Sequence, residues 1–425
     1  MRLDTPASPP SWTPVVITVG AGIVSALQVG KATVALGDIR ADLMLDLATA
    51  SWILSAFALV GAVGGAAIGM AVDRVGDRRM AVAGLILQSV GAALGGVAPT
   101  ETSLIAARVL EGLGFLAVVV AAPAIVARLA PVGQMNRAMA LWATFMPVGL
   151  ALIMGAGPIL AAITWRDMWL GNAVLLAVYA IIVAIRIPEA ARAAQRGGSL
   201  VADIAFALHA GPPALLAALF AAYCALFFTV FGFLPTLLLD RLALGPELAG
   251  PVSGLAVAVG IVGNLGCGSL LKLGIRPVRI LTVGFAVMAV TGVLFFWLPL
   301  PAVPALGLCI LFASVGGVVP VVVFDAAPRF APARPGGAVL IGATLGLIMQ
   351  GNNIGLLAGP SMAGASAAAF GWGSVAFAVV GLSAAAALCT VGFAVIERRL
   401  GAVRRSGSSP DSSGCPDRKP ASTGA

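Results

Sequence analysis

The sequence predicts an all-α polytopic membrane protein, with twelve transmembrane helices in two six-helix bundles and both termini in the cytoplasm. Three observations predict this class: the length of the apolar segments, their grouping, and the distribution of basic residues. Apolar residues make up 60% of the chain and charged residues only 10%, which is too much hydrocarbon for a soluble surface. Apolar runs long enough to cross a core of about 30 Å as helices recur along the chain. Continuous runs favour helices over a β-barrel.

The apolar segments fall into two groups of six, separated by a polar interval. The first group is expected at residues 15–36, 48–68, 81–98, 103–129, 139–163 and 168–185. The second group is expected at residues 213–239, 252–271, 280–298, 305–324, 338–360 and 374–396. The chain is therefore divided into a cytoplasmic N-terminus, a first bundle, a cytoplasmic linker, a second bundle and a disordered cytoplasmic tail, at residues 1–14, 15–185, 186–212, 213–396 and 397–425. The first segment lacks the pattern of a cleaved signal peptide, so we expect a retained span.

Basic residues set the orientation of the spans. With the N-terminus inside, most of the 25 Lys and Arg residues fall in inner loops and in the tail, whereas Arg40, Arg166 and Arg241 fall in outer loops. This asymmetry predicts cytoplasmic termini in a cell (inner) membrane protein. It also accounts for the net charge of +8 without a nucleic-acid partner.

A charged loop lies between the second and third apolar segments, at residues 69–79, and reads Gly-Met-Ala-Val-Asp-Arg-Val-Gly-Asp-Arg-Arg. A cytoplasmic loop needs the arginines but not the glycines and aspartate at these offsets. The pattern resembles the loop 2–3 signature of the major facilitator superfamily of secondary transporters, and the resemblance spans about residues 15–396. It implies a conformational latch made by Gly69, Asp73, Arg74, Gly76, Arg78 and Arg79. In this latch Asp73 would contact the N-terminus of the eleventh span, where the helix dipole favours a carboxylate.

No catalytic or metal-binding motif is present in the sequence. The chain has one histidine and no Cys-x-x-Cys, His-Glu-x-x-His or phosphate-loop motif. We therefore expect a protein that is not an enzyme, holds no cofactor or metal, and uses an ion gradient for uphill transport. Its expected partners are a small-molecule substrate, protons and the lipid bilayer, with no nucleic acid, and the protein is expected to be monomeric.

Three ionisable residues fall within predicted spans, where each is costly and is therefore a functional hypothesis. Arg108 and Glu111 lie in Arg-Val-Leu-Glu-Gly-Leu-Gly, which is similar to the superfamily pattern R-x-x-x-G-x-G, whose arginine is implicated in proton coupling. Residues at i and i+3 share a helix face, so a self-satisfied ion pair is the alternative. Lys31 lies in the outer third of its span, where it either snorkels outward or faces a polar cavity with Arg108 and Gln28. If both cations face that cavity, the remaining positive charge favours a small anionic or weakly acidic substrate.

Further polar candidates are Gln350 and Asn353 in the eleventh span and Tyr223 in the seventh. Amides near the middle of a membrane either contact substrate or bond to neighbouring helices. Tyr223 is a candidate cavity residue because it is an aromatic hydroxyl near mid-depth.

Three short stretches, at residues 29–38, 141–149 and 350–355, resemble the branch of the superfamily that includes cyanate and nitroimidazole transporters. The fifth span partly resembles the antiporter motif, but Ile159 and Leu160 replace its usual glycines. The sequence therefore predicts a secondary active transporter that works by alternating access, is coupled to protons and carries a small anion or weak acid. A proton-antiporting exporter of drugs or metabolites and a polytopic sensor without flux remain as alternatives.

Overall fold

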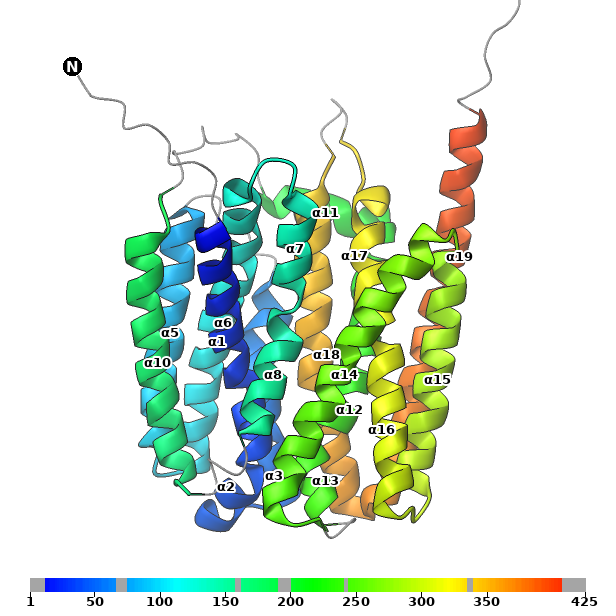
Figure 1. The fold of residues 1–425 in the computed structure, drawn as a ribbon. Coiled ribbons are helices and arrows are strands. Elements are labelled where there is room, and N and C mark those ends of the chain that lie inside the picture. The colour runs from blue at the N-terminus through cyan, green and yellow to red at the C-terminus, as the bar shows by residue number, and fades with distance from the viewer. Residues whose placement is uncertain are drawn as a thin grey trace, which may run out of the picture.

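The structure is a computed structural model, which describes residues 12–65, 75–156, 162–189, 200–240, 244–334 and 339–406. Within these residues, eleven helical runs are long and apolar enough to cross a membrane. A further long helix, α18 (Ile341–Phe370), carries Gln350, Asn352 and Asn353 near its middle, and these amides lower its hydropathy. The long helices run side by side along one axis (Figure 1), and the predicted fold class is confirmed.

The first half of the chain forms six spans, and two of them are interrupted. Its helices are α1 (Trp12–Val34), α2 (Leu36–Leu43), α3 (Leu47–Ser55), η1 (Ala56–Ala58), α5 (Asp77–Gly96), α6 (Glu101–Leu129), α7 (Met135–Ala143), α8 (Phe145–Gly155) and α10 (Trp165–Arg186). Short polar caps begin several of them: Asp46 accepts from the Thr49 amide at α3, and Thr100 and Thr164 form capping boxes at α6 and α10. Such caps satisfy amides that a helix leaves without partners.

The second half begins with the linker helix α11 (Leu200–Ala210) and then forms six more spans. Its helices are α12 (Pro212–Phe231), α13 (Leu234–Asp240), α14 (Pro246–Lys272), α15 (Pro277–Trp297), α16 (Ala302–Gly316), α17 (Val318–Phe330), α18, η2 (Trp372–Ser374) and α19 (Val375–Ser406). Proline stands in the first turn of α12, α14 and α15, where its missing amide costs nothing.

The last helix is longer than the sequence predicts. α19 continues to Ser406, so residues 397–406 are helical although they belong to the segment predicted to be disordered. Glu397 Oε1 lies 3.9 Å from Arg329 Nη1, which ties the first of these turns to the second bundle. Residues 407–425 of the predicted tail, and the predicted N-terminal segment before Trp12, lie outside the described residues.

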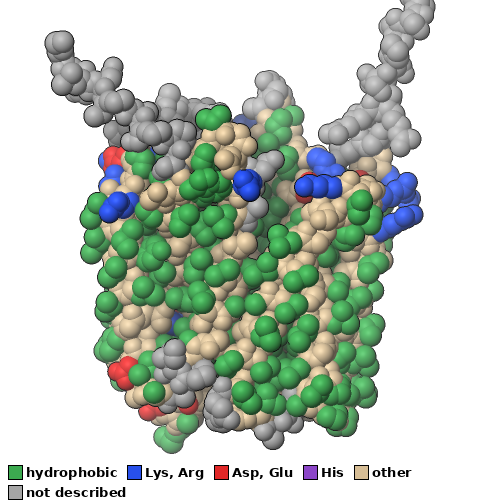
Figure 2. Space-filling model, viewed as in Figure 1, with side chains coloured by type: hydrophobic (Ala, Val, Ile, Leu, Met, Phe, Trp, Pro, Cys, Tyr) green, Lys and Arg blue, Asp and Glu red, His purple; other side chains and the backbone are tan. Residues whose placement is uncertain are grey.

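Both described ends of the chain and α11 lie at the same end of the molecule (Figure 1), which we call the cytoplasmic end from the distribution of basic residues. In the view of Figure 2, hydrophobic side chains cover the sides, and most of the visible Lys and Arg side chains lie near the cytoplasmic end. This surface fits a bilayer around the sides of the molecule.

The two halves of the molecule meet through α3 against α18 and α8 against α14. Ser361 Oγ donates to Ser55 Oγ at 2.8 Å, and a Cβ added at Gly364 would lie 2.3 Å from Ser51 Cβ. Ser51 and Ser55 lie at the beginning of the second span, so these contacts belong to the outer half of the membrane.

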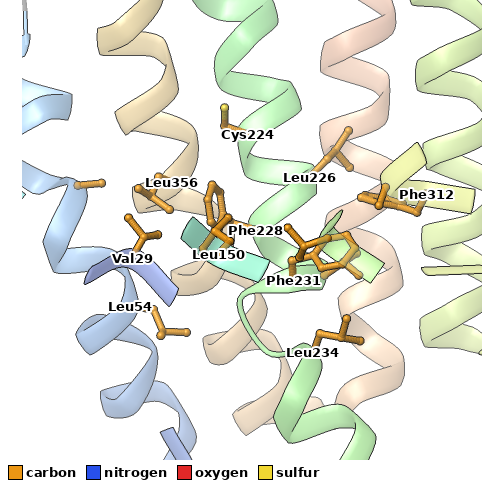
Figure 3. Packing of buried hydrophobic residues seen from close by; sticks show 14 of the residues in the cluster. Val29, Leu54, Leu150, Cys224, Leu226, Phe228, Phe231, Leu234, Phe312 and Leu356 are labelled. Atoms are coloured by element: carbon orange, nitrogen blue, oxygen red, sulfur yellow. The ribbon is translucent and has the colours of Figure 1, made fainter. Parts of the chain in front are cut away.

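A single hydrophobic cluster continues across this contact. In Figure 3, Val29, Leu54 and Leu150 of the first bundle lie close to Phe228 and Leu356 of the second. The two bundles are therefore joined by apolar packing as well as by the small residues of α3 and α18.

Candidate functional site

Three ionisable side chains meet inside the first bundle: Lys31 on α1, and Arg108 and Glu111 on α6. Each is 0% exposed. Lys31 Nζ lies 2.7 Å from Glu111 Oε1, and Arg108 Nη1 donates to Glu111 Oε2. One buried carboxylate therefore bridges two buried cations, and we call these three residues the charge cluster.

Four helices enclose the charge cluster. Arg108 Nε donates to the Ile53 carbonyl at 3.0 Å, and Arg108 Nη1 donates to the Gln28 carbonyl at 2.7 Å. The guanidinium carbon lies 4.5 Å from the centre of the Phe57 ring, and Lys31 Nζ lies 4.4 Å from that of Trp169. Aromatic faces attract cations, so both positive groups have favourable neighbours without water.

Amide and hydroxyl side chains continue this polar interior. Gln28 Nε2 donates to Asn172 Oδ1 at 3.0 Å, and Gln88 Nε2 donates to Ser25 Oγ at 3.0 Å. The sequence analysis missed Gln88 and Trp169 as neighbours of the charge cluster. Gln88 is a buried amide within a span, a signal that could have identified it, whereas Trp169 carries no such signal.

Of the two positions considered for Lys31 from the sequence, the structure shows no snorkelling, because the side chain is fully buried and its amine lies 2.7 Å from Glu111 Oε1. Successive residues of an α-helix are rotated by about 100°, so the side chains of Val29 and Lys31 point about 160° apart, to nearly opposite sides of α1. Val29 belongs to the apolar cluster that both bundles share (Figure 3), and Lys31 therefore points into the first bundle. The structure does bring Gln28, Lys31, Arg108 and Glu111 together, but in the interior of one bundle.

The candidates in the second half lie apart from the charge cluster. Gln350 Nε2 donates to the Ala62 carbonyl at 3.0 Å, and it thereby joins α18 to the first bundle. Asn353 donates to the Met349 carbonyl of its own helix at 2.8 Å, and its amide fills the space beside Gly61. The two amides therefore lie at the contact between the bundles.

Tyr223 belongs to an aromatic group on α12. Its ring stacks on Phe220 with centroids 5.7 Å apart and is tilted against Phe227 at 6.1 Å. The Phe220 ring in turn meets Phe324 edge-on at 5.5 Å, and Phe324 is 39% exposed. This end of the group is open to contact with other molecules.

The second span connects the charge cluster with α18. Its helix tightens at η1, and its carbonyl groups bond to side chains of both bundles: Ile53 accepts from Arg108, and Ala62 accepts from Gln350. A Cβ added at Gly112 would lie 1.6 Å from the Phe57 carbonyl oxygen. Only glycine allows α6 to approach the second span this closely.

The loop predicted to act as a latch is described only in part: Gly69, Asp73 and Arg74 lie outside the described residues. Gly76 has φ +96° directly before α5, a conformation that favours glycine. Arg78 Nη2 donates to the Ala184 carbonyl.

Carboxylates pair with the arginines that follow this loop. Arg79 Nε donates to Glu189 Oε1 at 3.1 Å, and the hydrogen bonds from Arg79 hold the pKa of the Glu189 carboxyl below its usual value. Asp77, which the sequence analysis did not select, accepts hydrogen bonds of 3.0 and 3.1 Å from Arg128. These pairs hold the cytoplasmic ends of α5, α6 and α10 together.

Two joined helical bundles, a buried charge cluster in one of them and a basic cytoplasmic end define a polytopic helical membrane protein. The family comparison agrees, because residues 18–344 match the model of the Major Facilitator Superfamily. The chain belongs to this family. It is therefore a multi-pass cell membrane protein, as the sequence predicts.

Curated relatives match part of the chain. The uncharacterized MFS-type transporter EfpA of Mycobacterium tuberculosis is 28% identical over 221 residues, which cover 48% of this chain and 41% of EfpA. The puromycin resistance protein pur8 of Streptomyces alboniger is 28% identical over 162 residues, which cover 37% of this chain and 32% of pur8. The matched stretch thus spans less than half of each relative.

Solved structures match nearly the whole chain. A bacterial homologue of the human lysosomal transporter Spinster, in an inward-facing and unoccupied conformation, superposes with a TM-score of 0.69 at 18% identity, over 93% of this chain and 96% of the homologue. Its occupied form gives a TM-score of 0.67 at 16% identity, over 94% of this chain and 98% of that one. At these identities the likeness shows the fold alone.

Proposed function

We propose that the protein moves a small solute by alternating access and that protons supply the driving force. The observation that carries the proposal is the charge cluster. With Glu111 ionised, its carboxylate separates two cations that lie within hydrogen-bonding distance of it. In a dry interior these charges interact far more strongly than in water, so gain or loss of one proton changes the energy of the cluster greatly.

The second span gives that energy a route to the contact between the bundles. Arg108 binds the Ile53 carbonyl, and Gln350 binds the Ala62 carbonyl further along the same span. A proton exchanged at the charge cluster therefore acts on an element that helps to hold the two bundles together. Because the contacts at Ser51 and Ser55 lie in the outer half, we propose that the described conformation is closed to the outside.

The loop at residues 69–79 is part of this proposal as the latch on the cytoplasmic side. Arg79 and Asp77 already join α5 to α10 and α6 through Glu189 and Arg128. If these pairs keep the cytoplasmic end of the first bundle rigid, a contact between the loop and the second bundle would hold the two whole bundles together.

The position of Lys31 changes the expected substrate. The sequence predicts an anionic substrate on the condition that Lys31 and Arg108 face a shared polar cavity, whereas in the described conformation both are fully buried against Glu111 inside the first bundle. The candidates outside the charge cluster are amides and aromatic rings, such as Gln350 and Tyr223. We therefore propose a small organic solute that is bound through amide hydrogen bonds and aromatic contacts.

Export is the second candidate, because one relative is named a puromycin resistance protein. Puromycin is for this reason a suitable first probe, and benzoate represents the weak acids that the sequence analysis favours. A thermal-shift screen with both compounds identifies a ligand before flux is measured, since binding stabilises the folded protein.

The test is flux of the bound compound in proteoliposomes with and without a pH gradient. Per folded protein recovered from size-exclusion chromatography, Glu111→Gln should lower gradient-driven flux at least about tenfold and leave exchange at equal pH in place. Glu101→Gln is the matched control, because Glu101 lies on the same helix, in its first turn and outside the charge cluster. Flux that ignores the pH gradient, or a Glu111→Gln protein that still responds to it, would contradict proton coupling.

A further inference from the structure

Five exposed basic residues gather at the cytoplasmic rim of the second bundle: Lys272, Arg276, Arg279, Arg398 and Arg399. They lie at the end of α14, at the start of α15 and on the cytoplasmic part of α19. α15 and α19 pack against each other, and the charge of Arg276 acts on Glu397 of α19. These residues therefore form one surface, which we call the basic rim.

Nearby carboxylates neutralise only part of the basic rim. Asp325 Oδ2 lies 2.6 Å from Arg329 Nη2, and Glu397 Oε1 lies 3.9 Å from Arg329 Nη1. Both carboxylates are thus shared with Arg329. Within the described part of the chain, the five residues of the basic rim have no ion-pair partner.

The first bundle is built differently at the same end. Arg79 pairs with Glu189, and Arg128 pairs with Asp77. Positive charge alone would satisfy a cytoplasmic orientation in both bundles, so orientation does not explain why Arg79 and Arg128 are paired with carboxylates whereas the five described residues of the basic rim are not.

Apolar side chains that face outward continue from the basic rim along the same helices. Val283 and Val395 are 60% and 43% exposed and lie one helical turn from Arg279 and Arg398, and Leu273, which is 77% exposed, directly follows Lys272 at the end of α14. In a membrane, exposed apolar side chains of this kind contact the acyl chains of lipids. A molecule with an anionic head and a hydrocarbon tail would match both parts of this surface.

We propose that the basic rim binds the headgroups of anionic phospholipids, with their acyl chains against α14, α15 and α19. Each Lys or Arg near an anionic membrane surface adds a favourable contribution, and the attraction falls off within a Debye length. Arginine can also bind phosphate through two parallel hydrogen bonds. The lipid thus supplies negative charge for the rim residues that have no carboxylate partner in the described part of the chain.

The test titrates two lipids with the same acyl chains, dioleoylphosphatidylglycerol and dioleoylphosphatidylcholine, into the purified full-length protein in detergent. The rise in apparent melting temperature reports binding. Wild type should bind the glycerol lipid more tightly, and Lys272→Gln/Arg276→Gln should weaken that binding about tenfold or more. Arg137→Gln/Arg186→Gln removes the same charge from exposed positions of the first bundle and should change binding less than about twofold.

A second variant, Arg398→Gln/Arg399→Gln, tests the same surface from another helix and should weaken binding to a similar extent. Raising NaCl to about 0.5 M should reduce the difference between the two lipids. Equal binding of both lipids, or equal losses in the first-bundle control and the rim variants, would overturn the proposal. Inorganic phosphate that stabilises the protein as much as the anionic lipid would show recognition of free phosphate and would overturn it too.

Discussion

The two bundles share an architecture but differ in what they bury. The first bundle encloses Lys31, Arg108 and Glu111, each without exposed surface. In the described part of the second bundle, the buried polar side chains are hydroxyls and one amide, with no buried charge. Its interior is rich in aromatic rings, for example Phe228, Phe231 and Phe312 (Figure 3).

This difference assigns the response to protons and the binding of solute to different bundles, although one central site could serve both. In the proposed function, the charges buried in the first bundle respond to protons, whereas amides and aromatic rings bind an organic solute. If the tasks are separate, a change in the charge cluster alters coupling without touching solute contacts, and the second span must connect the two. Each prediction below tests one part of this contrast.

The largest effect is expected for Glu111→Gln. The substitution leaves Lys31 and Arg108 buried without a counter-charge, which typically costs about 3–5 kcal/mol. Lys31→Met should cost much less, because it leaves the Arg108–Glu111 pair intact. Thr229→Val in the second bundle, which removes hydrogen bonds of 2.8 and 3.3 Å to two carbonyls, should cost about 1 kcal/mol.

Apparent melting temperatures in one detergent, read by size-exclusion chromatography after heating, compare these three variants. The order of losses should be Glu111→Gln, then Thr229→Val and Lys31→Met with much smaller values. A loss for Lys31→Met as large as that for Glu111→Gln would mean that Lys31 stabilises the bundle by itself. It would contradict the prediction that removing the carboxylate costs much more stability than removing one of its two cationic partners.

A smaller effect is expected where α6 approaches the second span. Gly112→Ala places a methyl group 1.6 Å from the Phe57 carbonyl oxygen, so the helices must move apart at a cost of about 1–3 kcal/mol. Gly307→Ala in the second bundle has no atom within 4 Å of the new Cβ and should be neutral or slightly stabilising. If both variants melt alike, the close approach of α6 is not needed.

Sequence patterns predicted most of this fold because it depends on composition. Three features that depend only on position along the chain predicted the long helices and their grouping. They are the length of the apolar runs, the polar interval between the two groups and the distribution of arginines. The pairing of Arg108 with Glu111 also followed from their i, i+3 spacing.

The direction of Lys31 could not be predicted in the same way. Its depth in the membrane follows from counting residues, but its direction depends on which face of α1 meets α6 and α10. Neither Trp169 nor Val29 carries a signal of that choice in the sequence. The interruption of the second span at η1 was equally hidden, because the 3₁₀ turn consists of Ala56, Phe57 and Ala58, which suit an ordinary helix.

The smallest effect is expected at the link between the bundles, for Gln350→Leu. This change removes the hydrogen bond of 3.0 Å to the Ala62 carbonyl, and such bonds in membranes contribute about 0.6–1.7 kcal/mol. The described conformation should lose population about three- to twentyfold, and its outer contact at Ser361 should open more often. In a protein without its native cysteines, Ser361→Cys should then react faster with a membrane-impermeant maleimide.

Thr344→Val is the matched control on the same helix, because the Thr344 hydroxyl donates to the Leu340 carbonyl one helical turn earlier and not to the first bundle. Unchanged labelling in Gln350→Leu would show that the second span and α18 are held by packing alone, and the proposed route from the charge cluster to the contact between the bundles would lose its last step.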